Sequence, residues 1–350
     1  MTMRLLMFVR DPSWFGGVVN FVKSLEVNLS ENVGVTEFRI GQRKGARGKW
    51  LQPFVPFFDA IRLAWHLVRH KYDIVHVNPS LNTKSLVRDA LFLLVLRLRG
   101  IKNTVVFIHG WEESAALTIE NNLLLKKIFL SLFGGAPVIY VLAKQFKSRL
   151  VGWGIDSARV HVVTTMFDGG QFAGISRNRA DDKIHVLFLS RFEREKGIYE
   201  LLEAFSALRD SFPGMVLILA GTGPEEAAMV EWVDKAGLSE CVTFTGYIRD
   251  KEKAQVLMDA DMFVFPTYYG EGCPVSLLEA MAAGLPVVTS SAGGIGDFIV
   301  DGKNGRLLDT VTTAKVEEAM LDLLANPEDR KTISEYNRKS AWEHYEATVV

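Results

Sequence analysis

The chain has 350 residues, about twice the usual size of one domain, so two α/β domains are the expectation. Hydrophobic residues at 48% and charged residues at 23% exclude a disordered chain, a collagen-like fibre and a coiled coil. Two cysteines are too few for a disulfide framework, no secretion signal precedes the first apolar run, and no run is long enough to span a bilayer. We therefore expect a protein of the reducing cytoplasm.

The charge is divided unevenly along the chain, although the net charge is only −1. Residues 1–170 hold 22 Lys and Arg against 12 Asp and Glu, a net +10, and the remainder holds 18 against 29, a net −11. This asymmetry predicts that the first half meets a negatively charged partner, such as an anionic membrane surface or a phosphorylated acceptor. Nucleic acid fits less well, because no RNA- or DNA-binding motif accompanies the basic residues.

Short apolar or β-branched runs alternate with segments of helical period, the pattern of parallel βαβ units. The first half predicts strands and then helices at the following residues: strands 5–9, 37–40, 74–78, 104–108 and 138–142; helices 18–29, 57–69, 83–97 and 121–133.

The alternation stops over a polar, Gly-containing stretch and then resumes. This predicts an N-terminal domain at 1–168, a linker at 169–182 and a C-terminal domain at 183–350. The second half predicts strands at 186–189, 216–220, 242–244, 262–265 and 286–289. The fold class is therefore α/β, with two Rossmann-like, doubly wound parallel-sheet domains facing a central cleft, where such folds bind ligands.

The segment 269–284 follows a predicted strand and opens a helix. Pro274 suits the first helical turn and Gly284 suits the stop, so Glu271 is expected in the loop and Glu279 on the helix. The backbone around the helix start would form an anion site, built by Gly272, Cys273, Pro274 and Val275, with Pro274 lacking an N–H. Read alone, the segment is equally a surface helix that carries two carboxylates.

With this spacing of two glutamates, the sequence resembles the retaining glycosyltransferases of the GT-B fold, in the family 4-like or "glycosyl transferases group 1" class. In that family the first Glu contacts hydroxyls of the donor sugar and the second holds the nucleotide ribose. The resemblance implies these roles for Glu271 and Glu279. A carboxylate suits them, because it accepts two charge-assisted hydroxyl hydrogen bonds at once.

A second element, residues 190–197, resembles the family's Arg-x4-Lys-Gly. There the two cations clamp the donor diphosphate, which gains charge as the glycosidic bond breaks, so the resemblance implies this role for Arg191 and Lys196. Without the resemblance, the same residues read as a mixed-charge surface turn.

Loops after other predicted strands also match the family. The resemblance implies that Gly16 and Gly17 lie beside the donor phosphates and that His109 lies near the donor sugar. On their own, a Gly pair also fits a packing turn and a lone His a hydrogen-bonded structural role. The remaining matches are Gly221 and two further groups of residues. The resemblance implies that the nucleotide base lies beside Gly246, Tyr247 and Ile248, and that the donor phosphate lies near Gly293 and Gly294.

The sequence departs from the family at two positions. Asp297 stands where members usually have Glu, and Pro274 where many have Gly. Two other patterns give weak support for a metal site. Asp259 and Asp261 form a motif that binds metal in a different fold, and His66 with His70 fits a solvated helix face. No cofactor and no metal are expected.

Basic residues in the first half gather in two places: Arg43, Lys44, Arg47 and Lys49 with Trp50, and Lys84, Arg88, Arg97, Arg99 and Lys102 flanking the apolar 91–96. This pattern fits an interfacial surface on a cytoplasmic membrane. A helix buried on the sheet accounts equally well for residues 91–96.

These observations together predict a metal-independent, retaining transfer of a sugar from a UDP- or GDP-sugar to a saccharide or lipid-linked saccharide, in cell-surface polysaccharide or glycolipid synthesis. Retention follows from the family resemblance alone. A nucleotide-sugar epimerase or hydrolase of the same fold, or a catalytically silent binding module, remains an alternative at this point.

Overall fold

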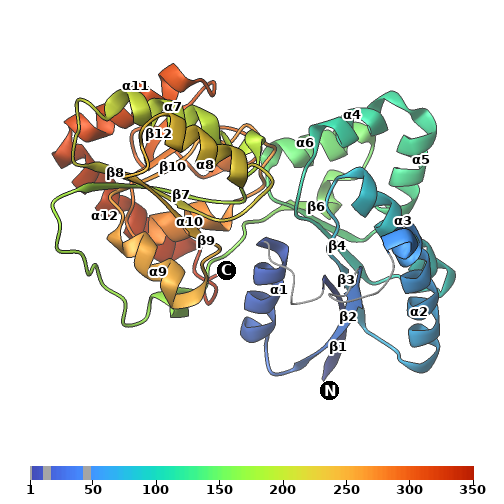
Figure 1. Cartoon of the computed structure of the whole chain (residues 1–350). Coiled ribbons are helices and arrows are strands. Elements are labelled where there is room, and N and C mark those ends of the chain that lie inside the picture. Colours follow the sequence, from blue (N-terminus) through green and yellow to red (C-terminus); the bar gives the residue numbers. More distant parts are fainter. Residues whose placement is uncertain (1, 11–16, 42–48) are drawn as a thin grey trace. The chain divides into compact units, whose positions relative to one another are not determined.

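The computed structural model describes residues 2–10, 17–41 and 49–350, without the side chains of Asn20 and of residues 49–51. The chain divides into two compact units, Met1–Thr164 (unit 1) and Thr165–Val350 (unit 2), described one at a time (Figure 1). Over the described ranges, no helix combines the length and the apolar content that crossing a membrane requires.

The described part of unit 1 is built on a six-stranded parallel sheet with the order β2-β1-β3-β4-β5-β6. Its strands are β1 (Met3–Arg10), β2 (Val33–Ile40), β3 (Ile74–Val77), β4 (Thr104–Ile108), β5 (Val138–Val141) and β6 (Val160–Val162). Its helices are α1 (Gly17–Asn28), α2 (Val55–Arg69), α3 (Thr83–Leu98), α4 (Glu113–Asn121), α5 (Leu123–Leu132) and α6 (Lys144–Trp153). Central strands such as β3 and β4 are apolar because helices cover both faces of a doubly wound sheet.

The structure corrects the elements predicted at the end of unit 1. The helix predicted at 121–133 is observed as α5, which begins at Leu123 because the Asn122 side chain accepts hydrogen bonds from Leu124 and Leu125 N–H, both 3.0 Å, and so caps it. The preceding helix α4 was not predicted. Strand β6 and helix α6 were not predicted. Residues 91–96 lie within α3, where Phe92, Leu93 and Leu96 are buried in the core. This agrees with the interpretation of these residues as a helix buried on the sheet.

Unit 2 contains a second six-stranded parallel sheet, with the order β12-β11-β10-β7-β8-β9. Its strands are β7 (Ile184–Leu189), β8 (Met215–Ala220), β9 (Val242–Gly246), β10 (Met262–Phe265), β11 (Val287–Ser290) and β12 (Gly305–Leu308). Its α-helices are α7 (Ile198–Leu208), α8 (Glu226–Lys235), α9 (Asp250–Asp259), α10 (Val275–Ala282), α11 (Thr313–Ala325) and α12 (Pro327–His344). Each unit thus has the predicted Rossmann-like, doubly wound form.

The boundary between the units lies at Thr164 and Thr165, slightly before the expected position. The segment 169–182, predicted as a linker, packs on unit 2 instead. Arg177 donates to Asp261 Oδ1 at 2.6 Å, Arg179 donates to Asp261 Oδ2 at 2.9 Å, and Asn178 N–H donates to Asp259 Oδ1 at 2.8 Å. Polar side chains and backbone groups of this segment therefore bind residues at the end of α9 and just before β10.

The strand order of unit 2 reverses between two neighbouring strands. The chain runs from β7 outward through β8 and β9, and then returns to place β10 on the other side of β7. Loops after β7 and β10 consequently diverge, and the crevice between such loops is the usual ligand site of an open α/β sheet. Unit 1 has the same reversal between β1 and β3.

Candidate active site

The loops at the reversal point of unit 2 bring together two residues that the sequence singled out. Lys196, at the end of a single 3₁₀ turn (η4, Arg194–Lys196) after β7, forms an ion pair with Glu271, in the loop after β10. The Lys196 side chain is 9% exposed and that of Glu271 17%, so both groups are largely shielded from water. The Lys196 ammonium also lies 4.4 Å from the centre of the Tyr269 ring, which attracts a cation.

Backbone hydrogen bonds hold these loops in register. The carbonyl of Glu195 accepts from Tyr268 N–H at 3.0 Å and from Tyr269 N–H at 3.2 Å. On the other side, the carbonyl of Glu271 accepts from Gly294 N–H at 2.7 Å. The three loops after β7, β10 and β11 therefore form one backbone platform beneath the ion pair.

Gly293 is required by this platform. Its φ of +63° lies in the left-handed region, and a Cβ placed there would be 1.8 Å from the Glu271 carbonyl oxygen. Gly293 and Gly294 thus lie beside Glu271, and the glycine pair allows the loop after β11 to approach the backbone of the Glu271 loop.

The second glutamate has partners that the sequence motifs did not include. Glu279 lies within α10 and is 4% exposed. Its Oε1 pairs with the ammonium of Lys253, on α9, and accepts a hydrogen bond from Gln171 Nε2 at 3.1 Å. Lys253 and Gln171 carried no recognisable spacing in the sequence, because they come from separate elements, α9 and the 3₁₀ turn η3 (Gly169–Phe172).

Arg191 differs from its motif partner Lys196. Its side chain is 72% exposed and forms an ion pair with Glu193 at 2.7 Å, whereas Phe192, between Arg191 and Glu193, is fully buried. The loop is anchored by Phe192 and Lys196, and Arg191 lies on its solvent-exposed side.

The start of α10 lies within one residue of the prediction, which put Pro274 in the first helical turn. Pro274 is the N-cap residue and Val275 the first helical residue, and Gly284 follows the helix end with a φ of +83°. Gly272 and Cys273 are buried, and the Cys273 carbonyl accepts a hydrogen bond from the Thr165 hydroxyl at 2.7 Å.

Loops after β8 and β9 complete this edge of the sheet. Gly221 N–H donates to the Gly246 carbonyl at 2.9 Å, which joins the two loops. Tyr247 is partly exposed, and partial burial raises the pKa of its hydroxyl, while the neighbouring Ile248 is buried.

In unit 1, His109 follows β4 and is buried. Its Nε2 lies 2.9 Å from Asn78 Oδ1, and its ring stacks on Phe107 with 3.9 Å between ring centres. Because the Asn78 amide nitrogen donates to the Phe8 carbonyl at 3.0 Å, Asn78 Oδ1 accepts from His109, which places the proton on Nε2 and a lone pair on Nδ1. Burial lowers the pKa of His109 to about 3, so the ring is neutral at physiological pH.

The remaining candidates in unit 1 are only partly described. Gly17 is the first residue of α1, and Gly16 lies outside the described residues. Arg43, Lys44 and Arg47 also lie outside them.

The two other sequence patterns, Asp259 with Asp261 and His66 with His70, each contain a side chain that contacts other residues of its own unit. Asp261 binds Arg177 and Arg179, and these contacts together with a backbone hydrogen bond hold the pKa of its carboxyl low against the opposing effect of burial. His66 lies 2.7 Å from the Tyr72 hydroxyl. In the described parts of the chain, no three His, Cys, Asp or Glu side chains gather as a metal site would need.

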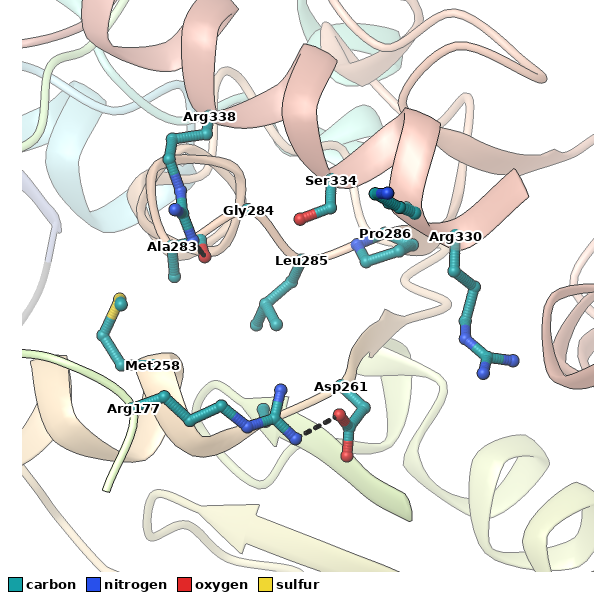
Figure 2. Close-up of a pocket in the computed structure, with 12 residues that line it drawn as sticks. Arg177, Met258, Asp261, Ala283, Gly284, Leu285, Pro286, Arg330, Ser334 and Arg338 are labelled. Carbon is teal, nitrogen blue, oxygen red and sulfur yellow. Dashed lines mark hydrogen bonds and ion pairs between the residues drawn. The ribbon is translucent and has the colours of Figure 1, made fainter. Parts of the chain in front are cut away.

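A cavity of about 220 Å³ opens at the opposite edge of the unit 2 sheet, where β10 and β11 begin (Figure 2). Several of its cations have backbone partners: Arg330 donates to the carbonyls of Leu323 and Leu324, and Arg338 donates to that of Ala283. These arginines cap the ends of α11 and α10, where the helix dipole favours a positive charge. This cavity is distinct from the loops that hold Lys196 and Glu271.

Comparison with known proteins matches residues 175–340 to the family model described as glycosyl transferases group 1. The match covers slightly less than half of the chain and lies within unit 2. The matched residues include Arg191, Lys196, Glu271 and Glu279, so the family match covers all four motif residues that suggested it.

Curated relatives extend the similarity. Glycogen synthase of Mycobacterium tuberculosis is 29% identical over 180 residues, 51% of this chain and 43% of that protein. A GDP-mannose-dependent alpha-(1-6)-phosphatidylinositol monomannoside mannosyltransferase of Mycolicibacterium smegmatis is 26% identical over 298 residues, 77% of each chain. The chain spans about half the length, or less, of the first relatives it matches.

The fold is shared over a longer stretch than the family match. HepE of Anabaena, solved in complex with UDP-glucose, is 17% identical and superposes with a TM-score of 0.77 over 99% of this chain and 96% of its own. Both units therefore have the Rossmann-like folds of the GT-B class.

Proposed function

We propose that this group 1 family chain is a retaining, metal-independent glycosyltransferase that moves a sugar from a nucleoside-diphosphate sugar to a saccharide or lipid-linked saccharide. The pairing of Lys196 with Glu271 at the reversal point of the unit 2 sheet carries the proposal. A cation and a carboxylate side by side there offer what a sugar diphosphate needs: one group for the phosphates and one for the sugar hydroxyls.

Lys196 would stabilise the departing diphosphate as the glycosidic bond breaks. Its ammonium has three N–H donors, so it can keep its bond to Glu271 and still donate to a phosphate oxygen. Arg191, exposed in the same loop, would supply the second cation once a donor is bound. Pre-positioned charge of this kind costs little reorganisation during the reaction.

Glu279 would hold the ribose diol of the nucleotide. Lys253 and Gln171 already bind its Oε1 and so fix the orientation of the carboxylate. Tyr247, in the loop after β9, would flank the base, with Gly246 and Ile248 shaping that loop. The glycines after β8 and β11 and the start of α10 would let the backbone approach the nucleotide and its phosphates.

The neutral ring of His109 would face the donor sugar with the lone pair of Nδ1 rather than with a positive charge. A neutral ring is compatible with a developing oxocarbenium ion, which a protonated one would repel. The acceptor hydroxyl would pass its proton to the departing phosphate on the same face of the sugar, which retains the configuration.

Relatives and neighbours named for GDP-mannose and UDP-glucose support a GDP- or UDP-sugar as donor. We further propose a role in cell-surface polysaccharide or glycolipid synthesis, in the cytoplasm beside an anionic membrane. The net +10 of residues 1–170 supports the membrane assignment.

A thermal-shift panel of UDP, GDP, ADP, CDP and NAD tests the donor site first. A ligand at 100 times its Kd should stabilise the protein by about 2.7 kcal/mol. We expect one nucleoside diphosphate to raise the melting temperature, and the shift to vanish in Glu279→Ala. Stabilisation by NAD alone would contradict the proposal.

Product analysis by NMR then tests the reaction with the matching sugar nucleotide. A glycosidic product of retained configuration is expected only when a sugar acceptor is present. An epimerised or hydrolysed donor without acceptor would indicate the alternative chemistry, and donor binding without turnover would indicate a binding module.

A further inference from the structure

Helix α2 carries an unusual row of exposed apolar side chains. Their spacing is three or four residues, except for one adjacent pair, so they lie along one face of the helix. Each is between 44% and 61% exposed: Phe54 just before the helix, and Phe57, Phe58, Ile61, Trp65 and Val68 within it. The opposite face of the same helix buries Ala60 and Leu63 in the core of unit 1.

Two neighbouring helices extend this apolar face. Helix α3 packs between α2 and α5, and all three bury residues in one core cluster, represented by Leu63, Phe92 and Phe129. Their outer faces therefore form one layer of the surface, and Figure 1 shows α2, α3 and α5 along the same side of unit 1. On α3 and α5 that layer exposes Val87, Leu94 and Leu98, and Leu123, Leu124, Leu125 and Ile128.

The charge on these three helices has a single sign at the surface. They contain seven Lys and Arg and only two acidic residues, Asp59 and Asp89. Both aspartates are buried and ion-paired, Asp59 with Arg62 at 2.9 Å and Asp89 with Arg88 at 2.7 Å. The three helices therefore carry a net positive charge, and their outer surface combines this charge with apolar side chains.

Resting on the membrane location proposed above, we propose that this α2–α3–α5 surface docks on an anionic lipid bilayer, with the apolar row of α2 inserted among the acyl chains. A helix with aromatic and aliphatic residues on one face and basic residues beside it lies in the plane of such an interface. Arg69 stands 5.1 Å over the Trp65 ring, so a cation at headgroup depth and an aromatic ring below it come from one helical turn.

Insertion of apolar side chains and attraction between charges predict different effects of salt on membrane binding. Electrostatic binding to anionic lipid weakens steeply with salt, because counterions screen it. Burial of apolar side chains is not screened. The inserted row should therefore preserve a substantial part of vesicle binding at high ionic strength.

Vesicle co-sedimentation of the full chain tests the proposal, with phosphatidylglycerol in phosphatidylcholine at low and at high salt. The triple variant F57S/F58S/W65S should weaken binding by roughly 100-fold or more at both ionic strengths, as expected for three lost aromatic insertions. The matched control V230S/L321S replaces two side chains of unit 2 with 48% and 43% exposure and should bind like the wild type.

Trp65→Phe supplies a second readout that does not depend on catalysis. The wild type should show a blue shift of tryptophan emission on vesicle addition, and Trp65→Phe should still bind but lose most of that shift. Donor-nucleotide binding should be unchanged in all these variants, which keeps this test separate from the proposed transfer reaction.

Three results would overturn the proposal. The first is vesicle binding that the triple variant leaves intact, and the second is no vesicle binding by the wild type. The third is a lipid-free dimer that F57S/F58S/W65S converts to a monomer, because a second copy of the chain would then cover this surface.

Discussion

Lys196 and Glu271 lie 75 residues apart in the sequence and form an ion pair across the strand-order reversal of the second sheet. One follows β7 and the other follows β10, the two strands between which the connections change direction. The loops that follow these strands hold both side chains largely shielded from water, so the protein itself positions the charges proposed to meet a sugar diphosphate.

The first prediction concerns this pair. Lys196→Ala should lower kcat by about 10²- to 10³-fold, because it removes one pre-positioned charge from the leaving group. Steady-state kinetics with the donor identified by the thermal-shift panel measures the effect. Lys235→Ala is the control, since Lys235 forms an exposed ion pair with Glu231 and should leave kcat unchanged. Near-normal turnover in Lys196→Ala would remove Lys196 from the proposed mechanism.

The second prediction separates stability from binding at Glu279. Lys253→Met should destabilise the protein by about 3 kcal/mol, because it leaves the buried Glu279 carboxylate without its cation. The double variant Lys253→Met/Glu279→Leu should regain much of that stability and still fail to bind nucleotide. Urea unfolding and nucleotide titration measure the two quantities. Nucleotide binding by the double variant would show that Glu279 does not hold the ribose.

The third prediction is a pH dependence of stability from two buried histidines. Burial lowers the pKa of His76 to about 4 and that of His109 to about 3, whereas both would titrate near 6.5 in the unfolded chain. Their contribution to stability is therefore complete above pH 6.5 and is lost as the pH falls from there towards these lowered values.

Each histidine should contribute up to about 1.4 kcal/mol per pH unit to that loss. His109→Gln should reduce the slope of unfolding free energy between pH 5 and 6 by about one proton, measured by urea unfolding. His70→Gln replaces an exposed histidine and serves as the control. An unchanged slope in His109→Gln would mean that His109 is accessible to protons in the folded state.

The fourth prediction distinguishes backbone strain from a steric clash at Gly293. Gly302 also has a positive φ, +73°, but open space around it, so Gly302→Ala should cost only about 1–2 kcal/mol of strain. Gly293→Ala should cost clearly more and should weaken nucleotide binding, because its Cβ would displace the Glu271 carbonyl. Chemical denaturation of both variants gives the comparison. Equal costs would show that the Glu271 loop yields without penalty.

Much of the fold could be predicted from the sequence. All ten predicted strands coincide with observed ones, because buried parallel strands are short apolar runs bounded by turns and helices. The missed strands, β6 and β12, are short and carry polar residues such as His161 and Arg306, so they do not resemble apolar runs. Helix α4 was also missed, although the predicted start of the next helix at residue 121 lies one residue from the Asn122 cap of α5.

The sequence by itself determined the two doubly wound units and the motif residues Arg191, Lys196, Glu271 and Glu279, because strand patterns and motif spacings are local along the chain. The tertiary structure decided the rest. It paired Lys196 with Glu271, gave Glu279 the partners Lys253 and Gln171, turned the expected linker into an ion-paired segment, and left the apolar row of α2 exposed. These are contacts between distant segments, and they depend on strand order and burial, which spacing along the chain does not encode.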